Sequence, residues 1–152
     1  LSDSVYGNTS VAAIGVAAHE SGHAVQYAEG YAPLKFRNAI VPVTQFGAKL
    51  STPLVILGLI LSIYPLAYAG IILFGAVVVF QLVTLPTEFN ASRRALAVLE
   101  EGNYLDGEEL RGAKKVLSAA AMTYVAALFM SLMSLLRLIV IVSGSKNSRN
   151  RR

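Results

Sequence analysis

The sequence contains no cysteine, and only two histidines occur among its 152 residues. Without cysteine, the chain has neither a disulfide framework nor a thiolate metal site. Charged residues are also scarce, at 14%, whereas hydrophobic residues make up 55%, and the mean hydropathy is +0.57. These values are too apolar for an ordinary soluble domain. The composition therefore predicts a membrane protein.

Three long apolar stretches are expected to cross the bilayer. They cover residues 46–64, 66–85 and 117–142, each close to the roughly 20 residues that a helix needs to cross about 30 Å of hydrocarbon. Pro65 separates the first two, so we expect them to form a tight hairpin. One long buried helix of a soluble protein is the alternative, and the nearly uncharged run of residues 54–83 argues against it.

Both histidines belong to one motif, His19-Glu20-Ser21-Gly22-His23, which reads H-E-x-x-H. Residues four apart stand on the same face of a helix, so the two imidazoles can hold one tetrahedral zinc ion. Glu20 follows the first histidine and provides a carboxylate beside the bound water, as general base for peptide hydrolysis. A chance match is the alternative, but it would leave three buried polar groups in need of partners.

The flanking sequence predicts that this motif lies on a helix. Asn8, Thr9 and Ser10 offer N-cap side chains, and Gly30 with Pro33 supplies a stop. The residues between contain neither a proline nor a run of β-branched side chains. The motif's neighbours are small or apolar, as expected for a helix that crosses a packed interior with only its metal face polar.

Two polar segments separate the hairpin from the last span. Residues 87–101 are expected to form a helix that closes at Gly102-Asn103. Asp106 and Glu109 form a capping box that opens the next helix, which is expected to run directly into the third span. No internal repeat and no Gly-rich phosphate loop are found in the sequence.

These elements predict an all-α integral membrane protein, with about three transmembrane helices, a metal helix and short membrane-adjacent helices. The first residue is leucine rather than methionine, so we expect a fragment or a processed form. We expect a single domain in four regions: the metal helix region (1–37), the transmembrane hairpin (38–86), the membrane-adjacent helices (87–116), and a transmembrane helix with a basic tail (117–152).

The hairpin also suggests a third metal ligand. Zinc hydrolases hold the metal with three protein ligands and leave the fourth position for water. No third histidine exists, so the remaining ligand must be a carboxylate. Two crossings return the chain to the face of the motif, where most carboxylates look like solvated surface charges: Asp3, Glu29, Glu100, Glu101, Asp106, Glu108 and Glu109.

Glu88 differs from these carboxylates. It lies just beside a span, at an expected helix start, among small and neutral neighbours. We therefore predict a site for one zinc ion, Zn2+, with His19, His23 and Glu88 as ligands and Glu20 as the catalytic base.

A known family shares these features. Residues 88–95, which read E-F-N-A-S-R-R-A, follow the H-E-x-x-H motif after the predicted hairpin. Together with residues 12–14 and 112–117, they closely resemble the neutral zinc metallopeptidases of bacterial membranes, the YugP-like group. The resemblance covers nearly the whole chain and implies a membrane-bound zinc endopeptidase. Family members have an additional N-terminal span and a short domain ahead of the metal helix, and both are absent from this sequence.

More distantly, the layout is similar to the HtpX-like and CAAX-processing membrane proteases, whose glutamate ligand is followed four positions later by aspartate. Ser92 stands at that position, so the carboxylate that would orient a ligating histidine is missing. Asn90 or Ser92 is expected to substitute for it less strongly. Candidates for an oxyanion donor are Arg94, Tyr27 and Tyr124, although solvated arginines and interfacial tyrosines are commoner.

Two other functions remain open. A zinc-stabilised membrane scaffold without turnover would keep the metal, but it has no use for Glu20. A membrane interaction module would apply the net charge of +4 to anionic lipid. Its support is the basic tail, although such tails are commonly topology signals: Lys146, Arg149, Arg151 and Arg152.

The expected location is the bacterial plasma membrane, with the active site on the cytoplasmic face. This orientation follows from basic residues, because seven lie on the motif's side against four in the tail: Lys35, Arg37, Arg93, Arg94, Arg111, Lys114 and Lys115. The expected partners are a peptide or protein substrate and the lipid bilayer, with no nucleic acid and an open oligomeric state.

Overall fold

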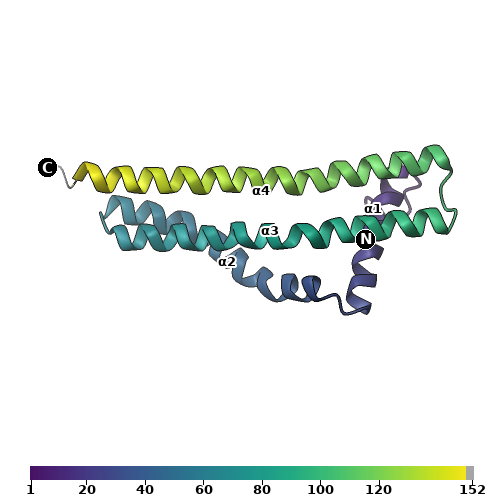
Figure 1. The fold of residues 1–152 in the computed structure, drawn as a ribbon, viewed down its shortest axis with the longest axis horizontal. Coiled ribbons are helices and arrows are strands. Elements are labelled where there is room, and N and C mark those ends of the chain that lie inside the picture. The colour runs from purple at the N-terminus through teal and green to yellow at the C-terminus, as the bar shows by residue number, and fades with distance from the viewer. Residues whose placement is uncertain (150–152) are drawn as a thin grey trace. The chain divides into compact units, whose positions relative to one another are not determined.

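The computed structural model describes residues 1–149, which form four α-helices joined by short turns (Figure 1). The helices are α1 (Val11–Ala28), α2 (Ala32–Ile60), α3 (Tyr64–Glu101) and α4 (Gly107–Arg149). No strand occurs among the described residues. The all-α fold class expected from the sequence is therefore confirmed.

Three of the helices, α2, α3 and α4, are long and apolar enough to cross a membrane. This confirms the three predicted transmembrane helices. Most residues in their apolar windows are not buried, and in α4 the buried share of that window is only 11%. A soluble protein would hide such side chains, whereas in a bilayer they contact lipid.

The turn between α2 and α3 comes earlier than predicted. It lies at residues 61–63, where Ser62 has a φ of 60°. Pro65 occupies the first turn of α3. A backbone N–H at this position would have no intrahelical acceptor, so proline costs the helix no hydrogen bond. The prediction that the first span ends at residue 64 and that Pro65 stops it is therefore wrong.

The membrane-adjacent helices are not separate elements. α3 continues through Pro86 to Glu101, so the prediction of a new helix near residue 87, with Glu88 at its start, is wrong. An internal proline removes one backbone hydrogen bond, but transmembrane helices tolerate it because neighbouring helices hold the chain. The second polar segment forms the first part of α4, so the prediction that its helix runs directly into the third span is confirmed.

α4 also includes much of the predicted basic tail, because the helix extends to Arg149. The C-terminal arginines of that prediction, Arg151 and Arg152, lie outside the described residues.

Capping interactions at α1 and α4 agree with the sequence. The Ser10 hydroxyl accepts a hydrogen bond from the Ala13 N–H (3.2 Å), and Gly30 follows α1 with a φ of 69°, a conformation that favours glycine. Before α4, the Asp106 carboxylate accepts from the Glu109 N–H (2.8 Å) and the Glu109 carboxylate accepts from the Asp106 N–H (3.0 Å). These two bonds are the predicted capping box.

The chain divides into two compact units. Unit 1 comprises residues 1–36 and 83–125, and unit 2 comprises residues 37–82 and those from 126 onward. Unit 1 contains α1 with the adjoining parts of α3 and α4. The predicted single domain with four regions remains a prediction.

Small residues bring the helices of unit 1 together. A Cβ added at Gly22 of α1 would lie 2.5 Å from the backbone oxygen of Ala91 in α3, so only glycine allows this approach. Gly15 faces Ala113 of α4 at ordinary contact distance, since an added Cβ would lie 3.8 Å from the Ala113 Cβ. These contacts place the H-E-x-x-H motif directly on α3.

Unit 2 has an apolar core. It contains Val55 from α2, Ala67 and Ile71 from α3, and Val142 from α4. Gly58 of α2 lies so close to the backbone of Ala67 that an added Cβ would clash. Such small-residue contacts are the usual way for membrane helices to pack closely.

Candidate metal centre

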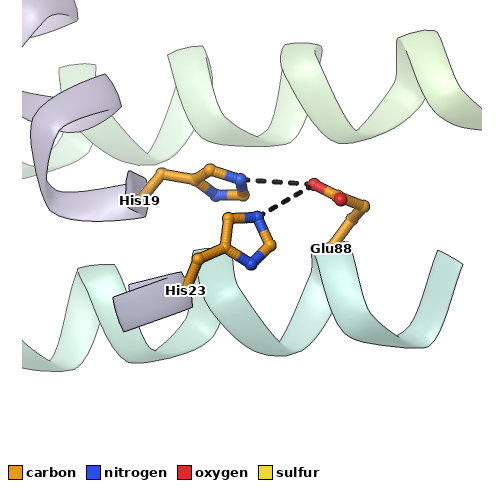
Figure 2. Close-up of side chains that lie close together, drawn as sticks. All are labelled: His19, His23 and Glu88. Carbon is orange, nitrogen blue, oxygen red and sulfur yellow. Dashed lines mark ion pairs between the residues drawn. The ribbon is translucent and has the colours of Figure 1, made fainter. Parts of the chain in front are cut away.

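The two histidines lie one turn apart on the same face of α1, as predicted. Their ring centroids are 4.7 Å apart, and the rings are nearly perpendicular. Figure 2 shows that both imidazoles project from α1 towards Glu88 of α3. They are only partly exposed, with 16% of the His19 side chain and 19% of the His23 side chain accessible.

Glu88 completes the cluster from α3. Glu88 is only 2% exposed, and one of its carboxylate oxygens faces both histidines. The distance from Oε2 to His19 Nε2 is 3.3 Å, and the distance to His23 Nε2 is 3.4 Å (Figure 2). The close approach of α1 to α3 at Gly22 makes these distances possible, since Gly22 immediately precedes His23.

The arrangement of donor atoms fits a zinc ion. Ligand atoms at about 2.1 Å from a tetrahedral ion stand about 3.4 Å from one another, which is the separation that Glu88 Oε2 has from each Nε2. One ligand atom from each of the three residues lies within 4.8 Å of the others. Among the described residues, these three form the one group of histidine and acidic side chains whose ligand atoms lie so close together.

The other ring nitrogen of each histidine has a hydrogen-bonding neighbour. His19 Nδ1 lies 3.0 Å from Ser92 Oγ, and His23 Nδ1 lies 2.9 Å from Gln26 Oε1. Both Nε2 atoms therefore point to the same place. Metal-binding histidines commonly have such a partner on the second nitrogen. Ser92, one of the two residues expected to orient a histidine, lies in this position.

Gln26 is a further residue of the site that was not predicted from the sequence. It is fully buried, and its amide nitrogen donates to the Thr87 carbonyl oxygen (2.9 Å) and to Asn90 Oδ1 (2.9 Å). Asn90, the other expected orienting residue, therefore contacts Gln26 rather than a histidine in these hydrogen bonds. A signal was present in the sequence: Gln26 lies three residues after His23, and a polar residue at that spacing shares the metal face.

Arg94 extends this chain of contacts to the surface. Its Nε donates to Asn90 Oδ1 (2.8 Å), and its guanidinium pairs with the Glu29 carboxylate at 2.7 Å. The Arg94 guanidinium is therefore engaged by Asn90 and Glu29. The other two candidate oxyanion donors are exposed, Tyr27 at 72% and Tyr124 at 44%.

Glu20 is exposed on α1, directly after His19. The remaining carboxylates considered as ligands are exposed as well, as predicted for solvated charges. Glu29 pairs with Arg94, Glu108 pairs with Arg111, and Asp106 and Glu109 cap α4. Glu88 is therefore the buried member of the candidate carboxylates.

Comparisons with known proteins identify the family. The family described as "Putative neutral zinc metallopeptidase" matches residues 1–143. The chain is also similar to a Bacillus subtilis (strain 168) protein named "Putative membrane protease YugP", with 48% identity over 147 residues. This match covers 97% of the chain and 65% of the relative, so the chain spans less than two thirds of the relative's length. No solved structure matches. The chain therefore belongs to the neutral zinc metallopeptidase family that its sequence resembles.

Proposed function

We propose that this protein is a membrane-bound zinc-dependent endopeptidase. The observation that carries the proposal is the convergence of His19 Nε2, His23 Nε2 and a Glu88 oxygen at 3.3 and 3.4 Å. These three atoms match the donor set of a catalytic zinc site, in which the fourth position is kept for water. The family name, which specifies a zinc metallopeptidase, supports the same metal and reaction class.

His19, His23 and Glu88 would hold one zinc ion. When bound, zinc supplies a coordinated water acidified towards a pKa of about 7 and a Lewis acid for the peptide carbonyl. The burial of Glu88 and the partial burial of both histidines favour metal binding over solvation, because paired charges inside a protein interact through a lower dielectric than in water.

Glu20 would act as general base and then as general acid. Its carboxylate accepts a proton from the attacking water and later donates that proton to the nitrogen of the leaving amine, as the C–N bond breaks. Its position one residue after His19 places it about 100° around the helix, so it can lie near the water without binding the metal. Its exposure leaves room for a substrate.

The substrate would be a peptide or protein segment, including segments of other membrane proteins, since three helices of the chain are suited to the bilayer. We place the active site on the cytoplasmic face of the bacterial plasma membrane. Basic residues support this orientation, because seven lie on the side of the motif and four in the C-terminal segment.

The Glu20→Gln variant tests the catalytic proposal. The substitution preserves size but removes proton acceptance, so we expect unchanged zinc content and a loss of about 100- to 10,000-fold in hydrolysis. The rate would be measured with a casein-like or membrane-derived peptide. Glu101→Gln, another exposed acid outside the proposed site, is the matched control and should cleave at the parent rate.

Equal rates for the parent and Glu20→Gln proteins would contradict the peptidase mechanism. Zinc binding by both proteins with no cleavage by either would instead favour the zinc-stabilised scaffold, because a structural site does not need a general base.

A further inference from the structure

Gln26 is a fully buried polar side chain on α1, one turn beyond His23. A buried amide without hydrogen-bonding partners destabilises the folded state. Gln26 avoids this cost through three hydrogen bonds, to His23, to the Thr87 carbonyl and to Asn90. The directions of these bonds can be deduced from the groups involved.

Arg94 can only donate hydrogen bonds. Its Nε lies 2.8 Å from the Asn90 side chain, so the atom of Asn90 at that position must be the acceptor oxygen, Oδ1. The same oxygen lies 2.9 Å from the Gln26 side chain. Gln26 must therefore present its NH2 group there, because two amide oxygens would repel.

A backbone carbonyl independently requires the same orientation of the Gln26 amide. The Thr87 carbonyl oxygen, 2.9 Å from the same end of Gln26, is an acceptor only. Both protons of the Gln26 amide are thus used, and its oxygen Oε1 faces His23 Nδ1 at 2.9 Å. Since Oε1 can only accept, His23 Nδ1 must carry a hydrogen and donate it.

This hydrogen determines the other side of the ring. An imidazole with one proton on Nδ1 has a lone pair on Nε2, and this atom faces Glu88 Oε2 at 3.4 Å. A proton or a metal ion between these two atoms would be attracted by both of them. The arrangement therefore prepares His23 Nε2 for a metal ion before one binds.

The position of the proton on the His19 ring is less strictly determined. Its Nδ1 neighbour is the Ser92 hydroxyl, at 3.0 Å, and a hydroxyl can donate or accept. Ser92 is thus compatible with either neutral form of the ring. The two histidines differ in this respect although both point their Nε2 atoms at Glu88.

We propose that Gln26 is a positioning residue that holds His23 in the Nδ1–H form and thereby preorganises Nε2 as a zinc ligand. The proposal rests on the proposed zinc site. Asn90 and Arg94 act through Gln26 by fixing the orientation of its amide, and the Arg94–Glu29 pair, at 2.7 Å, joins α3 to the end of α1 around the same point. Partners of this kind typically change metal affinity by about 10- to 100-fold.

The test compares the whole chain with its Gln26→Met variant, which has a similar size but no hydrogen-bonding group. Because the chain contains two histidines, nitrogen NMR of histidine-labelled protein resolves the protonated nitrogen of each ring. In zinc-free protein at alkaline pH we expect His23 as Nδ1–H in the parent and a mixture of both forms in Gln26→Met. Zinc affinity, measured against a chromophoric chelator, should fall by about 10- to 100-fold.

A second variant distinguishes the loss of the hydrogen bond to His23 from a packing defect. Gln26→Glu keeps an acceptor for His23, as in the common carboxylate–histidine pairs of zinc sites, and should keep the Nδ1–H form although it loses the two hydrogen bonds that the Gln26 NH2 group donates. Thr44→Val is the matched control. It removes a buried hydroxyl that donates to carbonyls of its own helix, at 3.2 and 3.0 Å, and should change neither readout.

An unchanged His23 proton position or an unchanged zinc affinity in Gln26→Met overturns the proposal. If the parent binds no zinc, the proposed function fails, while the proton position in zinc-free protein still reports on Gln26.

Discussion

Buried polar side chains behave differently in the two units. In unit 2, the hydroxyls of Thr44 and Ser51 donate to carbonyls of their own helix, α2. In unit 1, Gln26 bonds across from α1 to α3, and buried Glu88 meets two histidines of α1. Buried polar side chains thus link helices in unit 1, whereas Thr44 and Ser51 in unit 2 bond within their own helix.

In both units, nevertheless, a glycine allows two helices to approach closely. Gly22 meets Ala91 in unit 1, and Gly58 meets Ala67 in unit 2, each so closely that an added Cβ would clash. In unit 2 the close contact serves packing alone. In unit 1 it also sets the distance between the histidines and Glu88, so the same kind of substitution should have different consequences in the two units.

Gly22→Ala should have the largest effect. The new Cβ would lie 2.5 Å from the Ala91 backbone oxygen, so α1 must move away from α3 and carry His23 from Glu88. Overpacking of this kind costs about 1 to 3 kcal/mol of stability, and we expect zinc affinity to fall at least about tenfold. Thermal unfolding in detergent and chelator competition measure the two effects.

Gly15→Ala is the control in the same helix. Its Cβ would lie 3.8 Å from the Ala113 Cβ, an ordinary contact, and alanine favours a helix over glycine by up to about 1 kcal/mol. It should keep zinc and gain stability slightly. Parent-like zinc affinity in Gly22→Ala would show that the α1–α3 contact does not set the metal site.

Gly58→Ala should have a smaller and narrower effect. The clash with Ala67 separates α2 from α3 and should cost about 1 to 3 kcal/mol of stability, with zinc affinity unchanged. Gly75→Ala, where an added Cβ meets nothing within 4 Å, should be neutral or slightly stabilising. A loss of zinc affinity in Gly58→Ala equal to that in Gly22→Ala would remove the distinction between the units.

The sequence predicts those features that depend on local chemistry. The helix spacing of His19 and His23, the Ser10 cap and the Asp106–Glu109 capping box each involve residues within four positions, so their geometry follows from the helix itself. The convergence of Glu88 on the motif could also be anticipated, because two membrane crossings return the chain to the same side.

Other features depend on tertiary contacts. The continuation of α3 through Pro86 contradicts the local preference of proline, and a neighbouring helix outweighs that preference. Gln26 also bonds to Thr87 and Asn90, more than 60 positions away in the sequence, so only its contact with His23 could be anticipated from its spacing. Ser92 and Asn90, which were expected to orient a ligating histidine, lie close to Glu88 in the sequence, whereas Gln26 lies on the metal helix itself.

The central claim is that Glu88 is the third ligand of a zinc site with His19 and His23. The most direct measurement is the zinc content per chain of purified Glu88→Ala, beside His23→Ala and the exposed control Glu100→Ala. We expect Glu88→Ala to lose zinc about as severely as His23→Ala, since each removes one of three ligands, while Glu100→Ala keeps the parent content. Parent-like zinc in Glu88→Ala would contradict the account.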